Sequence, residues 1–172
     1  MTRQFSHTAE TARRLEPERF LCALFAPEEC RDALFALLAF AGETARIRHL
    51  VSEPMAGVIR LQWWRDAVQR VHEGGAAPGG HPVVQSLAEA IRRYRLPGAP
   101  FAALIEARQA ELEGSEPADW AARLAHAEAV SGGLHALMAD VLGTPDTASD
   151  ERAAAEVAVR HVGIAWGLVE DL

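Results

Sequence analysis

The chain has 172 residues, 49% of them hydrophobic and 24% charged, which is enough for one globular domain with a buried core. Its net charge of −7 argues against nucleic acid as a partner, because proteins that bind a phosphate backbone need a basic face. The same charge leaves room for a prenyl diphosphate or another lipid, since one local basic cluster would suffice for such a head group.

Residues 1–14 contain no apolar run of the kind found in secretory signals. The longest apolar run, residues 33–41, is far shorter than the ~20 residues that a transmembrane helix needs. The two cysteines, Cys22 and Cys30, form no Cys-x-x-Cys pair, and we expect both to fill core space as small apolar side chains. We therefore expect a soluble, cytoplasmic protein, with peripheral contact to a membrane surface left open.

Every segment of the chain with a clear hydrophobic period is helical. Pro17, Pro27, Pro54 and Pro82 each suit the first turn of a helix, and breaks rich in glycine or proline, such as residues 74–80, separate the segments. The expected helices cover residues 17–25, 27–50, 54–73, 81–94, 101–113, 118–142 and 149 or 150 to the end. No strand pattern and no repeat are visible, so we expect an all-α fold in one domain spanning the whole chain.

Four apolar side chains fall on one side of the first expected helix: Phe20, Leu21, Leu24 and Phe25. The second helix is apolar almost all round between residues 34 and 40, so we expect that part to be buried. Ser52 is expected to cap the third helix.

The C-terminal third contains two packing signals. The segment Ser131-Gly132-Gly133 lies inside the expected helix 118–142 and predicts close helix packing or a kink. Residues 163–172 are typical of a buried helix without a stop signal, with two carboxylates at the unfavourable end of the helix dipole. We infer from this pattern that a longer natural chain has been cut here.

Residues 40–66 resemble the first half of the squalene/phytoene synthase family. Further blocks match the family in order and spacing over nearly the whole chain, namely residues 19–21, 36–40, 81–82, 91–97, 101–111, 129–133, 141–143 and 162–165. The resemblance implies an isoprenoid-synthase-like helical bundle around a central cavity, with its last helices missing.

Catalytic members of this family carry an Asp-rich motif on the helix of residues 27–50, and it holds Mg²⁺ and a prenyl diphosphate. Carboxylates four residues apart can hold such ions together, but the matching positions read Ala45 and His49, neither of which is a hard oxygen ligand. Glu43 is the one carboxylate nearby inside the helix, and Glu111 matches a later partner carboxylate. The resemblance therefore implies a degenerate motif to which we assign no metal, with Mg²⁺ needed only if the protein is active.

The pattern Phe40-x-x-Glu43, followed by Ser52-Glu53-Pro54 and by residues 60–65, is most similar to a divergent branch of the family. That branch includes a mitochondrial assembly factor for respiratory complex I and its bacterial relatives, and it has lost much of the Asp-rich chemistry.

Arg46, Arg48 and His49 put positive charge where the enzymes have carboxylates. One interpretation is that they bind an anionic head group directly, by charge-assisted hydrogen bonds and without metal. The other is that they form a solvated helix end, where basic residues suit the dipole.

Arg60 and Trp64 have the i,i+4 spacing of a helical pair, so a stacked cation–π contact between them is one prediction. With Trp63 they would line a lipid-binding cavity or a partner surface. The alternative is that one tryptophan belongs to the core and the other is half exposed.

Three carboxylates follow on the helix of residues 101–113, and of Glu106, Glu111 and Glu113 we single out Glu111 as a remnant of a metal or water network. His126 and His135 lack the i,i+4 spacing of a helical zinc pair.

Three functional hypotheses follow. The first is a non-catalytic family member that binds a lipid or prenyl group, or that assists the assembly of a membrane complex. The second is an active head-to-head prenyltransferase that condenses two prenyl diphosphates, with Mg²⁺ held by Glu43, Glu111 and carboxylates beyond Leu172. The third is a plain helical interaction domain with a closed cavity.

Overall fold

The computed structural model describes residues 5–143 and 149–170, and these ranges contain helices and no strand. The helices are, in chain order, α1 (His7–Leu15), α2 (Pro17–Ala23), α3 (Glu28–Ala45), α4 (Ile47–Leu50), α5 (Pro54–His72), α6 (Pro82–Tyr94), α7 (Ala99–Leu112), α8 (Trp120–Ala127), the π-helical segment η1 (Glu128–Gly132), α9 (Gly133–Leu142) and α10 (Ser149–Glu170). The all-α prediction is confirmed. No helix in the described ranges has both the length and the apolar character that crossing a membrane requires.

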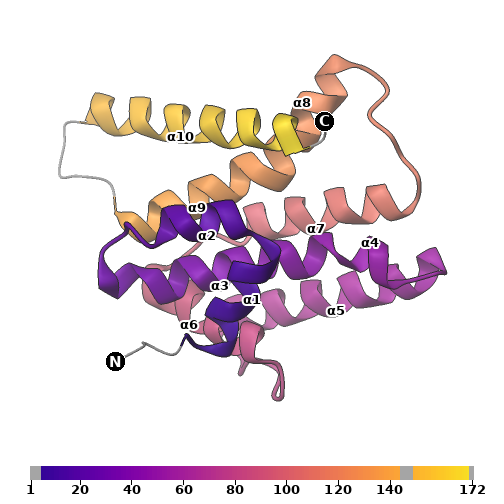
Figure 1. The fold of residues 1–172 in the computed structure, drawn as a ribbon, viewed down its shortest axis with the longest axis horizontal. Helices are drawn as coiled ribbons and strands as arrows, with labels where there is room; N and C mark the ends of the chain where they lie inside the picture. Colours follow the sequence, from indigo (N-terminus) through magenta and orange to yellow (C-terminus); the bar gives the residue numbers. More distant parts are fainter. Residues whose placement is uncertain (1–4, 144–148, 171–172) are drawn as a thin grey trace.

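Helix α3 runs through the middle of the bundle and carries much of the core (Figure 1). Residues 33–42 are all buried, as the apolar pattern predicted, and α1, α6 and α9 pack against this helix. The ring of Phe40 contacts Trp64 from α5 and Phe101 from α7, with ring centroids 5.4 Å apart in both pairs. Phe40 therefore ties α3 to the two helices that carry the later candidate residues.

The helix expected over residues 27–50 is divided at Arg46, and the prediction of one continuous helix is wrong. Helix α3 ends at Ala45, and the short α4 starts at Ile47. The His49 amide donates to the Arg46 carbonyl, three residues back, at 2.9 Å rather than to the carbonyl of Ala45. Ala45 and His49, the two positions of the degenerate motif, therefore do not share the i,i+4 geometry of one α-helical face.

Three of the four helix starts marked by proline are confirmed, whereas Pro27 is the capping residue before α3, which begins at Glu28. Pro17, Pro54 and Pro82 each begin a helix, and α5, α6, α7 and α10 start and end within two residues of the expected positions wherever both can be compared. Ser52 is not the cap of α5. The capping position is Glu53, whose side chain makes no capping hydrogen bond.

Helix α1 was not expected from the sequence. The Ser6 hydroxyl caps it by accepting the Ala9 amide at 3.2 Å. Its buried face consists of Thr8, Ala9, Thr11 and Ala12. Because these side chains are small or polar, they leave no hydrophobic period in the sequence.

The predicted apolar side of residues 17–25 is only partly buried. Phe20 is in the core, but Leu21 is 59% exposed and Phe25 is 92% exposed, since α2 ends at Ala23 and the chain turns away. Cys30 is buried as expected, whereas Cys22 is exposed, so the core prediction is wrong for Cys22.

The Ser131-Gly132-Gly133 segment permits close packing, as predicted, and it coincides with the π-helical turn η1 between α8 and α9. Helix α10 crosses this turn at Gly163. A Cβ atom on Gly163 would lie 2.8 Å from the Cα of Gly132 and 2.8 Å from the Ser131 carbonyl oxygen. A side chain at position 163 would therefore push α10 off η1.

A buried arginine links three elements at the same place. Arg19 of α2 is 5% exposed, forms an ion pair with Glu16, and donates from Nη2 to the Ser131 hydroxyl at 2.8 Å. Its guanidinium carbon lies 5.0 Å from the ring centroid of Trp166 on α10. This cation thus has hydrogen-bonding and aromatic partners from α2, η1 and α10, as a buried charge requires.

Only one side of α10 is buried, which corrects the expectation of a buried C-terminal helix. Gly163 and Gly167 face the bundle, whereas Val157, Val162 and Val169 are each more than half exposed. The side chains of Glu170 and Asp171 lie outside the described part of the chain.

Replacing Gly163 by Ala should lower the free energy of unfolding by about 2 kcal/mol, because the added methyl group meets backbone atoms that cannot rotate away. Urea unfolding followed by circular dichroism measures the change. Gly79→Ala is the matched control, since nothing lies within 4 Å of a Cβ there. An alanine at 163 that leaves the protein as stable as the control would contradict the packing described.

Candidate functional site

A cleft of about 670 Å³ is lined by residues of α4, α7 and α8 and of the loop that joins α7 to α8. We call it the Glu111 cleft, and its lining consists of Arg48, Val51, Ser52, Pro54, Glu111, Leu112, Gly114, Ser115, Glu116, Pro117, Arg123 and His126. Most of these side chains are polar. The cleft is therefore suited to a charged or hydroxylated group rather than to a bare hydrocarbon chain.

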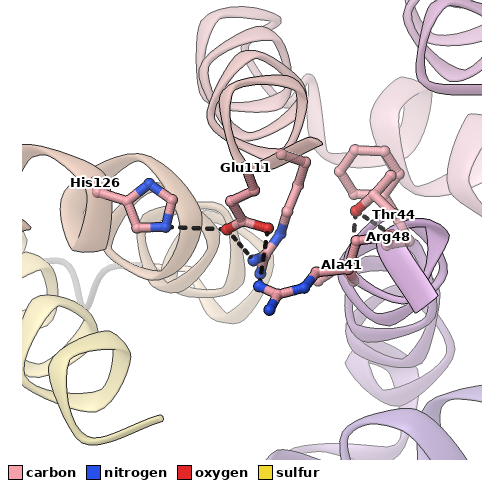
Figure 2. Close-up of polar contacts among 7 residues, drawn as sticks. Ala41, Thr44, Arg48, Glu111 and His126 are labelled. Carbon is pink, nitrogen blue, oxygen red and sulfur yellow. Dashed lines mark hydrogen bonds and ion pairs between the residues drawn. The ribbon is translucent and has the colours of Figure 1, made fainter. Parts of the chain in front are cut away.

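Glu111 is the most constrained side chain of the cleft, with 13% of its surface exposed. Its Oε1 accepts from Nη1 of Arg108 at 2.6 Å and lies 3.0 Å from Nε2 of His126. Its Oε2 faces Nη1 of Arg48 at 3.8 Å. Figure 2 shows His126 and Arg48 approaching the carboxylate from opposite sides. One carboxylate is thus shared by basic side chains from three helices.

The environment of Glu111 has opposing effects on its pKa. Burial raises the pKa, but the hydrogen bond from His126, the charge of Arg108 and the hydrogen bond from Arg108 together outweigh burial. The pKa of Glu111 therefore lies below its ordinary value of 4.5, and the side chain is ionised at neutral pH.

A second cleft, of about 290 Å³, lies on the other side of α4. We call it the Trp63 cleft, and it is lined by Glu43, Arg46, Ile47, Leu50, Arg60, Trp63, Trp64 and His81. Glu43 pairs with Arg46 at 3.1 Å inside α3 and its C-terminal turn. Burial lowers the pKa of His81, while the nearby Glu43 raises it to a smaller extent.

The candidate residues from the sequence therefore fall into two groups. The Glu111 cleft holds Arg48 and Glu111. The Trp63 cleft holds Glu43, Arg46, Arg60 and Trp64. The expected basic cluster is divided, because the turn at Arg46 directs Arg46 and Arg48 into different clefts.

Neither position of the degenerate motif lines either cleft. Ala45 is half-buried at the end of α3, and His49 is exposed on α4. On α3, which Figure 2 shows beside the site, the Thr44 hydroxyl donates to the backbone carbonyls of Phe40 and Ala41, both at 2.9 Å. This part of α3 therefore offers no carboxylate to the Glu111 cleft.

One tryptophan belongs to the core and the other is partly exposed, which is the second of the two interpretations given above. Trp64 is 4% exposed and packs on Phe40, whereas Trp63 is 38% exposed at the edge of its cleft. Both rings also contact His81, at centroid distances of 5.3 and 5.1 Å. The predicted cation–π pair of Arg60 with Trp64 is not among the cation–π contacts of the described residues, which involve Arg19 and Arg93 instead.

Three basic side chains of the Glu111 site were missed by the sequence analysis. Arg108 stands three residues before Glu111, so its i,i+3 spacing was a readable signal. His126 was considered only as a zinc ligand, and Arg123 was not considered. Both are on α8, and no spacing in the sequence indicates that α8 packs beside Glu111.

The residues around Glu111 do not fit Mg²⁺, the ion that the family's catalytic members use. Magnesium requires several oxygen ligands, usually carboxylates and water. Here Oε1 of the carboxylate is already bound by Arg108 and His126, a guanidinium from Arg48 faces Oε2, and Glu116 is the one other carboxylate in the lining. Within the described ranges, no three His, Cys, Asp or Glu side chains are grouped so that they could hold a metal ion.

Comparison with known proteins gives a consistent picture. A family model described as squalene/phytoene synthase matches residues 12–172. The chain is 31% identical over 163 residues to a Bos taurus protein named "NADH dehydrogenase (ubiquinone) complex I, assembly factor 6", an alignment that covers 95% of this chain and 46% of that protein. The Homo sapiens protein of the same name is 29% identical over 163 residues, with the same coverage. This chain thus spans about half the length of the curated relatives it matches.

Replacing Glu111 by Gln should lower the free energy of unfolding at neutral pH by about 1–3 kcal/mol, because basic side chains would lose a partly buried partner. The folded pKa lies below the ordinary 4.5, so this stabilisation is present above that value and is lost as the pH falls through the folded pKa. Urea unfolding across this pH range should show the two proteins converging in acid.

Glu106→Gln is the control for this measurement, because Glu106 is an exposed carboxylate on the same helix. It should change stability little at any pH. A difference between wild type and Glu111→Gln that stays constant down to about pH 3 would show that the Glu111 ion pairs do not contribute as described.

Proposed function

We propose that this chain, which belongs to the squalene/phytoene synthase family, is a non-catalytic member of it. The one carboxylate kept at the expected site, Glu111, is surrounded by basic side chains. Its proposed role is to assist the assembly of a respiratory NADH dehydrogenase. The observation that carries the proposal is the pairing of Glu111 with Arg48, Arg108 and His126.

This pairing argues against a prenyltransferase, because that reaction requires carboxylates that are free to hold Mg²⁺. Ionising a prenyl diphosphate leaves negative charge on the departing diphosphate, and the catalytic members neutralise it with Mg²⁺ bridged to carboxylates. Ala45 and His49 supply no carboxylate, and Glu111 forms an ion pair with Arg108 and a close contact with His126. The described residues therefore lack the ligands for that reaction.

The names of the relatives support the proposed role in assembly. Proteins from Bos taurus, Rattus norvegicus and Homo sapiens with 29–31% identity to this chain are named as complex I assembly factors. The alignments cover 95% of this chain, so the likeness is not confined to one segment of it. A common role in assembly is consistent with a fold kept without the metal-binding carboxylates.

We further propose that the Glu111 cleft binds the phosphate head group of a prenyl diphosphate or another lipid without metal. Arg48 is 53% exposed at the cleft, and Arg123 is exposed and makes no ion pair with the described residues. Ser115 and Ser52 add hydroxyl groups to the same lining. Guanidinium groups bind phosphate oxygens through charge-assisted hydrogen bonds, so they can hold such a head group without a metal ion.

Deleting the gene in the organism that encodes this chain should reduce the amount of assembled NADH dehydrogenase, seen on native gels with an in-gel activity stain. Prenyl products extracted from the same cells should stay unchanged. A deletion that leaves the complex intact but removes a squalene- or phytoene-type product would overturn the assembly role in favour of the enzyme.

Calorimetric titration of farnesyl diphosphate tests the cleft. We expect binding that EDTA does not abolish, and Arg48→Gln should weaken it about tenfold, the cost of one hydrogen bond to a charged group. Arg70→Gln, an exposed arginine outside both clefts, is the control. Binding that requires Mg²⁺ would contradict the proposal and restore the prenyltransferase hypothesis.

A further inference from the structure

Helices α4 and α5 expose a line of large apolar side chains that the bundle leaves uncovered. Met55 is 67% exposed, Ile59 is 65% exposed and Trp63 is 38% exposed, at successive steps of four residues along α5. Leu50 of α4 is 52% exposed and shares the Trp63 cleft with Trp63. We call these four side chains the apolar stripe.

The stripe follows one i, i+4, i+8 row, so its side chains are neighbours along a ridge inclined to the helix axis. At a rise of 1.5 Å per residue it extends about 12 Å along α5. The opposite side of α5, including Leu61, Trp64 and Val68, is buried in the core. A continuous apolar ridge on the outside of a helix is a surface that a broad partner can cover.

Positive charge accompanies the stripe in a chain that is acidic overall. The lining of the Trp63 cleft beside the stripe holds two arginines and one carboxylate, Glu43, which pairs with Arg46, whereas the whole chain has a net charge of −7. Arg60 and Arg46 line the Trp63 cleft beside the stripe, and Arg60 makes no ion pair with the described residues. The local charge therefore complements an anionic surface.

The geometry points to an anionic lipid bilayer as the occupant: we propose that the apolar stripe docks this protein on such a membrane, with Arg60 and Arg46 beside lipid phosphates. Helices that lie in a membrane interface combine a basic border with Trp and aliphatic side chains that enter the boundary between head groups and acyl chains. Trp63 suits this depth, because an indole ring is apolar with one polar N–H. Binding there would not require the Glu111 cleft, which lies on the other side of α4.

Sedimentation with vesicles tests the proposal. The wild-type protein should bind vesicles of phosphatidylcholine and phosphatidylglycerol at about 7:3, and bind poorly to phosphatidylcholine alone or at high salt. Met55→Gln combined with Ile59→Gln should weaken binding about tenfold or more, since two largely exposed apolar side chains lose their transfer into the interface. Both sites are exposed, so the variant should fold.

Matched controls separate this surface from apolar exposure in general. Leu21→Gln combined with Val157→Gln changes two apolar residues on α2 and α10 that are also more than half exposed, and this variant should bind like the wild type. Arg60→Gln should weaken binding to the anionic vesicles, whereas Arg14→Gln, which changes an exposed arginine on α1, should not.

Fluorescence quenching by vesicles with brominated acyl chains tests whether Trp63 enters the membrane. Trp63→Phe should remove most of the quenching of tryptophan fluorescence, and Trp120→Phe, which changes a residue 63% exposed on α8, should not.

Several results would overturn the proposal. The wild type could fail to bind anionic vesicles, or the α5 variant could bind as the wild type does. Quenching could depend on Trp120 instead of Trp63. Light scattering could also reveal a dimer that the α5 substitutions dissociate, which would make the stripe an interface between two copies of the chain.

Discussion

A carboxylate that is largely removed from water must be paired, because its desolvation is costly. Glu111 satisfies this requirement with basic side chains from α4, α7 and α8. The contribution of Arg48 is small, since that side chain is half exposed and 3.8 Å away. Arg108 and His126 approach more closely and are nearly buried, so they hold the carboxylate in place. The close contacts of Arg108 and His126 are both made to Oε1, while Oε2 has no hydrogen bond and faces only the Arg48 guanidinium at 3.8 Å.

The turn at Arg46 has an equally broad effect. Because α3 ends at Ala45 and α4 begins at Ile47, the Arg46 and Arg48 side chains point to different sides of α4. Each of them lines a different cleft. The cleft around Glu111 is polar and suits a phosphate group. The cleft around Trp63 opens beside exposed apolar side chains and suits the surface of a membrane. A protein that assists the assembly of a membrane complex could use both properties, one to bind a lipid head group and the other to stay at the bilayer.

Much of the fold could be predicted from local signals. Prolines at the first helical position and glycine-rich breaks gave the limits of α5 and α6, because these residues act through the backbone itself. Helix α1 was not predicted, because its buried face consists of Thr and Ala. The turn at Arg46 was not predicted either, because no Gly or Pro marks it. The site was less predictable. Glu111 came from the family resemblance, but its contact with His126 depends on how α8 packs, which no spacing in the sequence encodes.

The most direct test of the central claim is a titration of Mn²⁺ into the protein, followed by electron paramagnetic resonance of the free ion. Manganese prefers the same oxygen ligands as magnesium, so it reports on any carboxylate site of that kind. Since Glu111 is held by Arg108 and His126, we expect the signal of free Mn²⁺ to remain undiminished at equimolar protein. A loss of signal that Glu111→Gln restores would contradict the claim, because it would show that Glu111 still binds a divalent metal ion.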